Sequence, residues 1–404
     1  MADGDLTDDD MSTAAKREPE ITVGGARPRR WLGYPWRLLR AVSFFCAGRW
    51  PPPADGGRQP VESILVLQAN HIGDLLMTTP LLEVLRKGFP RARITVAAGA
   101  WNAETLAHNP HVDEFFTLPA PWDNAFVKPQ SALARLRFLL FSREARELAR
   151  RRFGVGIDAV GTRTNASMLI RIRPGRLLGP FFTDKPVPTG PERRHRIEVQ
   201  LDHAATLGLP ATAPILPQIF LTAGERARGA ELWVDGDVPA ARRPYRVVIA
   251  PASSRPYKCW SMDDFREVTR ILHGRGDVAL AIIGGNDTLE SAAHIATVDP
   301  TVRNYAGRIR LRETFGLIAN ADFVLCNANL AWHVAAAFDV PSAVVLTAAY
   351  LSAARERSEW GYPTSRVLGR DATHDGAYSA GEVAAIIGDA LDSRPRGASG
   401  TPPG

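Results

Sequence analysis

Three short polar segments each follow an apolar run and hold residue types that are able to act on a substrate. The first, residues 68–74, places Asn70, His71 and Gly73 just before Asp74, at the expected start of a helix. A carboxylate there serves as a general base, or it caps the helix by accepting backbone N–H groups. His71 orients a substrate under the first interpretation and caps the strand under the second. The spacing alone leaves both interpretations open.

A second segment, residues 251–260, combines hydroxyl groups with positive charge. Ser253, Ser254, Arg255 and Lys258 follow an apolar run and precede a helix. Hydroxyl and cationic donors that approach from one side, near a helix N-terminus, suit a diphosphate. A serine-rich surface turn is the structural alternative.

The third segment is Gly284-Gly285-Asn286-Asp287, which also follows an apolar run. Its glycines permit close approach of the backbone to a ligand. Asp287 is then placed to accept hydrogen bonds from ribose hydroxyls. A plain turn with a helix cap is the alternative interpretation of this segment.

Expected strands and helices alternate along the chain in two blocks. This alternation is typical of βαβ units on a parallel sheet, so we expect an α/β protein with two facing Rossmann-like lobes. Ligands of such sheets bind beyond the carboxyl ends of the strands, and the three polar segments should therefore line a cleft between the lobes. The predicted strands are 64–67, 94–98, 114–118, 156–160, 246–250, 278–283, 323–326 and 343–346, and the predicted helices are 74–88, 101–108, 133–152, 193–207, 263–273, 288–297, 312–320 and 331–338.

Four regions are expected along the chain: 1–60, 61–213, 214–378 and 379–404. The first holds an acidic, disordered tail and then a basic segment, 27–50, with six arginines, several aromatic residues and no acid. That segment either lies on an anionic membrane surface or packs as a helix on the folded body. The second and third regions are the two lobes, and the fourth is a helix with a disordered tail.

Composition excludes several classes of protein. In 404 residues no apolar run approaches the roughly 20 residues of a membrane span, so an integral membrane protein is not expected. The three cysteines, Cys46, Cys259 and Cys326, lie far apart, which favours a reducing compartment over a disulfide framework. The net charge of +6 indicates an anionic partner. The arginines of 135–152 share their helix with two glutamates and are interpreted as a solvated face, so no nucleic-acid partner is expected.

Taken in order, these segments resemble glycosyltransferase family 9, the heptosyltransferase family of lipopolysaccharide synthesis. Residues 64–80, ILVLQANHIGDLLMTTP, resemble its strand, loop and helix signature. Residues 251–260 resemble its loop that ends in Lys-x-Trp, and 284–287 its Gly-Gly-x-acid turn. The resemblance covers about 61–375 and extends through His195 and His333. It implies a GT-B architecture and inverting, metal-independent transfer of a sugar from a nucleotide diphosphate donor to a lipid-linked glycan.

The resemblance also implies roles for individual residues. Asp74 stands where the family has its general base, and Lys258 where it neutralises the donor diphosphate. Residues 61–213 become the acceptor domain and 214–378 the nucleotide-sugar domain. No metal or other cofactor is expected, the donor is expected to be ADP-heptose, and the location is the cytoplasm at the inner face of its membrane. The donor side is expected to include Ser253, Ser254, Arg255, Gly284, Gly285, Asp287, Asn329, Leu330 and His333, and the acceptor side Asn70, His71 and Gly73.

The sequence departs from the family at Ala328-Asn329-Leu330, where the family has Asp-Ser/Thr-Gly. An amide replaces a hydroxyl, and a leucine replaces a glycine whose backbone can approach phosphate. Two alternatives stay open for this reason: a catalytically degenerate relative that binds a glycan or a partner enzyme, and a nucleotide-sugar epimerase on the same fold. Asp235-Gly236-Asp237 is interpreted as a surface turn rather than a metal clamp.

Overall fold

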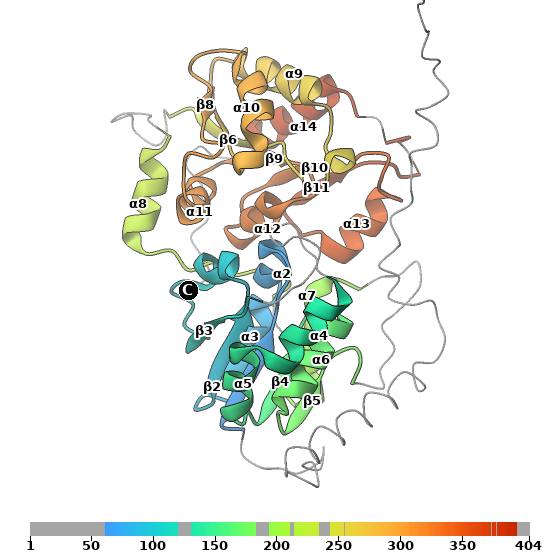
Figure 1. Cartoon of the computed structure of the whole chain (residues 1–404). Helices are drawn as coiled ribbons and strands as arrows, with labels where there is room; N and C mark the ends of the chain where they lie inside the picture. Colours follow the sequence, from blue (N-terminus) through green and yellow to red (C-terminus); the bar gives the residue numbers. More distant parts are fainter. Residues whose placement is uncertain are drawn as a thin grey trace, which may run out of the picture.

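Two parallel β-sheets, one in each half of the chain, organise the protein (Figure 1). The computed structural model describes residues 61–119, 131–182, 194–210, 214–233, 243–253, 255–372, 374–376 and 378–393. The N-terminal sheet consists of β1 (Ser63–Leu67), β2 (Arg93–Ala98), β3 (Glu114–Thr117), β4 (Val155–Asp158) and β5 (Arg176–Leu178). The C-terminal sheet consists of β6 (Tyr245–Ala250), β7 (Val278–Ile282), β8 (Arg303–Asn304), β9 (Phe323–Cys326), β10 (Ser342–Val345) and β11 (Ser365–Leu368).

The strand order reverses once in each sheet. The order is β3-β2-β1-β4-β5 in the N-terminal sheet and β11-β10-β9-β6-β7-β8 in the C-terminal sheet, with parallel neighbours throughout. The reversal falls between β1 and β4 in one sheet and between β6 and β9 in the other. At such a point the loops leave in opposite directions and open a crevice beyond the carboxyl ends of the strands. The predicted pair of Rossmann-like lobes is therefore confirmed.

Alternating side chains of the central strands explain why both faces of each sheet are covered. Ile64 and Val66 of β1 lie in one apolar cluster, while Leu65 and Leu67 lie in another on the opposite face. Strand β6 divides its apolar side chains between two clusters in the same way. Parallel strands that are buried on both faces read as continuous apolar runs, which is the pattern that predicts them here.

Helices cover both faces of each sheet. In the N-terminal lobe these are α2 (Ile72–Leu76), α3 (Thr79–Gly88), α4 (Ala132–Phe141), α5 (Arg143–Arg150), α6 (Arg163–Ile172) and α7 (Arg196–Thr206), with the 3-10 helix η2 (Ala100–Leu106). The remaining helices are α8 (Ala223–Glu231), α9 (Met262–His273), α10 (Leu289–Ala296), α11 (Leu311–Ala319), α12 (Leu330–Ala337), α13 (Ala353–Trp360) and α14 (Ala380–Asp392), with the short 3-10 helices η3 (Pro256–Lys258) and η4 (Asn286–Thr288).

Two predicted helices are each divided in the structure. The helix predicted at 74–88 is wrong as a single element, because α2 ends at Leu76 and α3 begins at Thr79. Pro80 lies at the start of α3 and has no N–H, and its ring would clash with the preceding turn of a continuous helix. The helix predicted at 133–152 breaks at Ser142, which is extended and whose Oγ accepts a hydrogen bond from the N–H of Ala145 to start α5.

Six strands and α-helices of the described chain were not predicted from the sequence: α6, β5, α8, β8, α13 and β11. Helix α8 lies in a polar, glycine-containing stretch, and it is stabilised by a capping box of Thr222 and Glu225 and by packing on α11. Helix α14, which the sequence analysis sets apart with the tail, packs on α9 and contributes to the apolar core of the C-terminal lobe. The segment predicted as a helix at 101–108 is largely the 3-10 helix η2.

Several predictions lie outside the described residues: the tail and basic segment in 1–60, the turn Asp235–Asp237, Ser254, and the tail from residue 394. The expected domain boundary at 213/214 falls beside residues 211–213, which are also outside them, and stays a prediction. Within the described part of the chain, no helix is both long enough and apolar enough to cross a bilayer.

Helices α8 and α11 cross at two glycines, and this crossing generates a prediction for stability. A Cβ on Gly229 would lie 2.1 Å from the carbonyl carbon of Gly316, whereas a Cβ on Gly224, in the same helix, would meet no atom within 4 Å. We expect Gly229→Ala to lower the free energy of unfolding by about 1–3 kcal/mol through overpacking. Gly224→Ala is the matched control and should be neutral or slightly stabilising. Chemical denaturation of both variants measures the difference, and equal midpoints would contradict the close crossing.

Candidate functional site

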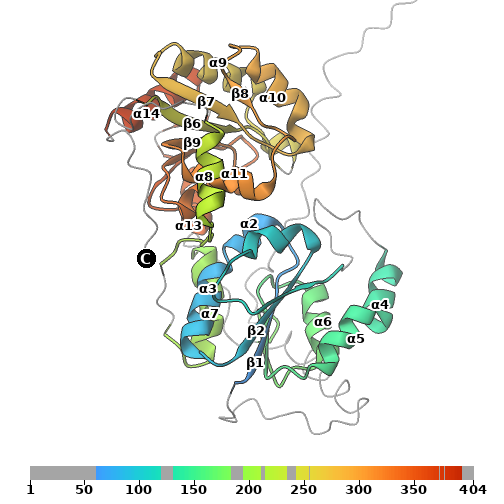
Figure 2. The ribbon, with the colours of Figure 1, turned by 90° about the vertical axis from the view of Figure 1, so that its left-hand side faces the viewer.

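Helix α2, which contains Asp74, lies at the edge of the N-terminal lobe that faces the C-terminal lobe (Figure 2). The N-cap of the helix is His71, so the interpretation of Asp74 as the N-cap is wrong: Asp74 lies in the first turn. Its Oδ2 accepts a hydrogen bond from the N–H of His71 at 3.2 Å and lies 3.5 Å from the His71 Nδ1. The side chain is 25% exposed, and no described residue donates a hydrogen bond to its Oδ1. One carboxylate oxygen thus supports the helix start, and the other is available to a substrate.

Buried hydrogen bonds hold the loop before Asp74. Gln68 is buried, and its Nε2 lies 3.3 Å from the backbone carbonyl of Asp74. The backbone carbonyl of Asn70 accepts hydrogen bonds from Trp101 Nε1 at 3.1 Å and from Asn102 Nδ2 at 3.2 Å. Asn70 is therefore an anchor of the loop through its main chain. A carboxylate on a loop held in this way has a fixed position, which general-base catalysis requires.

A histidine of the C-terminal lobe packs directly on Gly73. A Cβ on Gly73 would lie 2.9 Å from His333 Cδ2, so glycine is what allows the ring to approach α2. The opposite edge of the ring is bonded to Tyr362, whose hydroxyl lies 2.6 Å from His333 Nδ1. Burial lowers the pKa of His333 to about 4, although the negative charge of Asp74 opposes this shift. His333 is therefore neutral near pH 7 and leaves the charge of Asp74 in place.

Lys258 ends the short 3-10 helix that follows β6, on the carboxyl edge of the C-terminal sheet. Its Nζ lies 5.8 Å from the ring centroid of Tyr257 and 5.9 Å from that of Tyr350, at the outer limit of a cation–π contact. No described carboxylate forms an ion pair with it. Beside it, the Oγ of Ser253 is buried without a hydrogen-bond partner among the described residues, and Arg255 is exposed. A half-buried cation and an unused hydroxyl suit an anionic ligand on this loop.

Two asparagines after β9 hold this loop in place. Asn327 is fully buried; its Oδ1 accepts a hydrogen bond from the N–H of Trp260, and its Nδ2 donates to the carbonyl of Pro251. The Nδ2 of Asn329 donates to the carbonyls of Ala250 at 2.9 Å and Ala252 at 2.7 Å.

Each group of the Asn329 side chain therefore already has a partner within the protein. Its Oδ1 accepts a hydrogen bond from the N–H of Ala331 and caps α12. Leu330, the first residue of α12, is half-buried against the apolar core. At this departure from the family pattern, the side-chain amide of Asn329 connects α12 to the loop that follows β6, residues 251–260, which is called the β6 loop below.

The third predicted segment also lies on the carboxyl edge of the C-terminal sheet, after β7. A Cβ on Gly284 would lie 2.4 Å from Thr288 Oγ1, so this glycine is needed for the turn into η4. Gly285 precedes η4, and Asp287 is exposed. Burial raises the pKa of the Cys259 thiol, and the negative charge of Asp287 adds to this shift, so the turn lies near the loop that follows β6. The structure therefore brings the second and third segments together.

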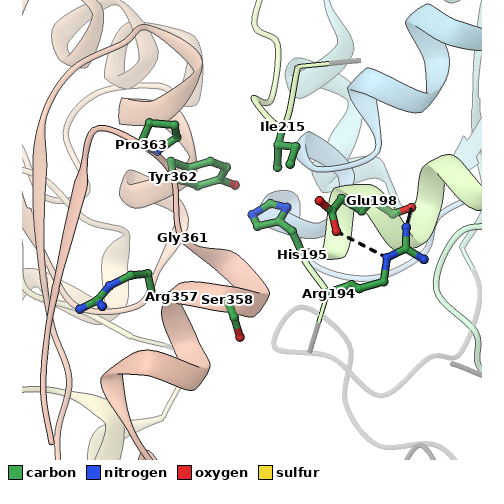
Figure 3. A pocket seen from close by; sticks show the side chains of 9 residues that line it. All are labelled: Arg194, His195, Glu198, Ile215, Arg357, Ser358, Gly361, Tyr362 and Pro363. Carbon is green, nitrogen blue, oxygen red and sulfur yellow. Dashed lines mark hydrogen bonds and ion pairs between the residues drawn. The ribbon is translucent and has the colours of Figure 1, made fainter. Parts of the chain in front are cut away.

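A cavity of about 580 Å³ opens between the lobes beside Tyr362 (Figure 3). His195 caps α7 there, with its Nδ1 accepting the N–H of Ile197, and its ring meets that of Tyr362 edge to face. Tyr362 connects the cavity to His333 and, through it, to Gly73. The N-terminal lobe and linker contribute Arg194, His195, Glu198 and Ile215 to the lining, and the C-terminal lobe contributes Arg357, Ser358, Gly361, Tyr362 and Pro363.

Sequence reasoning missed Tyr362, Asn327 and Asp158. Tyr362 lies 29 residues after His333 and in no motif, so only the fold brings it to the site. Asp158 is fully buried at the end of β4, next to the end of β1, and burial raises its pKa to about 6. An acid that ends an apolar strand was the available signal for it. The described residues contain no group of three or more His, Cys, Asp or Glu side chains that could hold a metal ion.

Comparison with known proteins identifies the class. The solved family 9 glycosyltransferase of Veillonella parvula has a TM-score of 0.68 at 18% identity, covering 84% of this chain and 99% of that one. The Escherichia coli ADP-heptose lipopolysaccharide heptosyltransferase II has a TM-score of 0.62 at 19% identity, covering 81% and 98%. The fold is that of the GT-B glycosyltransferases, with two Rossmann-like domains.

Sequence comparison matches the chain to one family of glycosyltransferases. The profile of glycosyltransferase family 9 (heptosyltransferase) matches residues 190–348. Lipopolysaccharide heptosyltransferase 3 of Escherichia coli (strain K12) is 23% identical over 289 residues, which cover 67% of this chain and 78% of that protein. Lipopolysaccharide heptosyltransferase 2 of Salmonella typhimurium (strain LT2) is 25% identical over 309 residues, covering 69% and 80%. The resemblance of the chain to glycosyltransferase family 9, a heptosyltransferase-like family of lipopolysaccharide synthesis, is confirmed.

The role of Asn329 as a link between the β6 loop and α12 is testable by removing only the hydrogen-bond donors of its side chain. Asn329→Asp keeps the capping oxygen but places a second oxygen against the carbonyls of Ala250 and Ala252. We expect a loss of about 1–3 kcal/mol in the free energy of unfolding, because two partly buried carbonyl acceptors lose their donor. Asn286→Asp, the same change at an exposed position, is the control. If both variants unfold at the wild-type midpoint, Asn329 does not hold the loop.

Proposed function

We propose that the protein is an inverting, metal-independent glycosyltransferase that moves a sugar from a nucleotide diphosphate to a lipid-linked glycan of the lipopolysaccharide type. The observation that carries the proposal is the placement of two features on the carboxyl edges of the two sheets, which meet where α2 packs on α12. The N-terminal lobe presents a carboxylate with an unused oxygen, and the C-terminal lobe presents a cation that, among the described residues, has no ion-pair partner and lies beside an unused hydroxyl. The family profile and the curated heptosyltransferases support the same activity.

Asp74 acts as the general base in this proposal. Its Oδ1 takes the proton of the acceptor hydroxyl while the hydroxyl oxygen forms a bond to the anomeric carbon of the donor. The bond from that carbon to the diphosphate breaks on the opposite face, and the nucleoside diphosphate leaves with the electron pair. Because His333 is neutral near pH 7, it carries no positive charge that would form an ion pair with Asp74.

Lys258 stabilises the leaving diphosphate. Negative charge builds up on the phosphate oxygens as the sugar is transferred, and a fixed cation lowers the free energy of that state. Ser253, Ser254 and Arg255 assist it on the same loop, and Gly284, Gly285 and Asp287 lie beside the nucleoside. In this arrangement protein groups alone neutralise the diphosphate, so the reaction needs no divalent ion.

The proposed donor is an ADP-sugar, with ADP-heptose the first to test. A solved Escherichia coli heptosyltransferase with ADP has a TM-score of 0.59 to this chain, which supports an adenine nucleotide as the first to test. We place the acceptor at the N-terminal lobe, beside Asn70, His71 and Gly73. The reaction would take place in the cytoplasm, at the inner face of the membrane that carries the acceptor.

The test is transfer by the variant Asp74→Asn, which keeps the shape of the side chain and removes its basicity. With ADP-heptose as donor and a lipopolysaccharide truncated in its heptose region as acceptor, we expect the transfer rate to fall by about 10²–10⁴-fold. Donor affinity, measured by calorimetry, should stay at the wild-type value because Asp74 lies on the acceptor side.

Glu62→Gln is the matched control for this experiment. It also removes one negative charge, but at the exposed opposite end of β1. Equal turnover by Asp74→Asn and wild type would overturn the role of Asp74. Absence of any nucleotide binding by the wild type would instead favour a degenerate binding protein.

A further inference from the structure

Helix α4 exposes an apolar face to solvent. Its large side chains Leu133, Leu136, Leu140 and Phe141 are 74%, 51%, 48% and 68% exposed. The three leucines are separated by three and four residues, which places them on one side of a helix. Among the described residues, four of the seven exposed large apolar side chains belong to this one helix.

The opposite face of α4 anchors it to the lobe. Phe138 and Leu139 are partly buried and pack on the apolar cluster under α5 and α6. The N-cap Ser131 accepts a hydrogen bond from the N–H of Ala134 and starts the helix. Figure 2 shows α4 at the outer side of the lobe, beyond α6. The exposed leucines thus form a second apolar face of this helix.

Positive charge surrounds the exposed leucines. Helix α4 contains Arg135 and Arg137 and no acid, and Arg137 is exposed among the leucines. Arg143 and Arg146 at the start of α5 are also exposed. Of the two acids of α5, Glu144 is half-buried and Glu147 pairs with an arginine, so the exposed charge beside the leucines stays positive on balance. A short helix with leucines on its outer face and arginines beside them matches the boundary between headgroups and acyl chains of an anionic bilayer.

This positive charge argues against two other partners for the exposed face of α4: a second copy of the protein and residues 27–50 of the same chain. A two-fold contact with a second copy would bring the exposed arginines of both copies together without an acid of α4 between them. Residues 27–50 of the same chain carry six arginines and no acid, and would be repelled in the same way. On an anionic lipid surface, by contrast, every nearby arginine stabilises binding, and the leucines enter the boundary of the acyl chains.

We propose that α4 is a membrane-contacting helix that docks the N-terminal lobe on an anionic lipid surface. It is the first described helix after β3, whose carboxyl end lies on the same edge of the sheet as that of β1, before Asp74. Docking at this helix brings that edge near the surface that holds a lipid-linked acceptor. In this respect the inference rests on the proposed function.

The test is flotation of the full-length protein with vesicles of phosphatidylcholine alone or mixed with phosphatidylglycerol. Wild type should bind the mixed vesicles, less so at high salt because the arginine contribution is screened. The variant L133Q/L136Q/L140Q should reduce the bound-to-free ratio at least about tenfold through lost apolar burial. Glutamine favours helix nearly as well as leucine, so α4 itself should persist.

The matched control is L289Q/L351Q, which changes two exposed leucines of the C-terminal lobe and should bind like wild type. Vesicle binding that is unchanged in the triple variant, or that is lost only when residues 1–60 are deleted, would overturn the proposal. A wild-type dimer in light scattering that the triple variant dissociates would assign the face to a second copy instead. Nucleotide binding, measured in the same samples, separates these outcomes from a failure of the proposed function.

Discussion

The contact between α2 and α12 determines how the two lobes meet, and the candidate site depends on it. The His333 ring packs on Gly73 with one edge and bonds Tyr362 with the other. Buried apolar side chains of both lobes, those of α2 and α12 included, form one continuous cluster. Because a side chain at position 73 would displace the ring, this glycine keeps the carboxyl edges of the two sheets facing each other. The same contact fixes the position of Asp74, which follows Gly73 in α2.

The charges of the site are divided between the lobes. Among the described residues, His71 is the one titratable group within ion-pair distance of Asp74. Lys258 in the other lobe has aromatic neighbours and no described carboxylate. The β6 loop does not need a ligand to hold its shape, since Asn327 and Asn329 connect it to β9 and α12. Preorganised charge of this kind is what makes electrostatic stabilisation of a leaving group effective.

The sequence predicts the sheets well and the long-range contacts poorly. Buried strands such as β1 and β6 follow from apolar runs, because strands covered on both faces cannot contain much else. The division of α2 from α3 was missed, although Pro80 signals it, because apolar spacing continues through the break. The hydrogen bonds of Asn329 and the contact of Tyr362 with His333 join residues far apart in the chain, and no local pattern encodes them. The sequence predicts a solvated face for the arginines of 135–152 but not the exposed leucines of α4, because periodicity does not say which of two apolar faces is covered.

The most direct test of the account is a calorimetric titration of the protein with ADP, UDP and GDP in the presence of a chelator. We expect ADP to bind with a stoichiometry of one. We expect Lys258→Met to weaken this binding by at least about tenfold, which corresponds to a loss of about 1.4 kcal/mol in binding free energy. Gly284 and Asp287 lie beside the same loop, so nucleotide binding should also protect that turn from hydrogen exchange. Binding of no nucleotide, or ADP binding that is indifferent to Lys258, would contradict the assignment of the C-terminal lobe as the donor side.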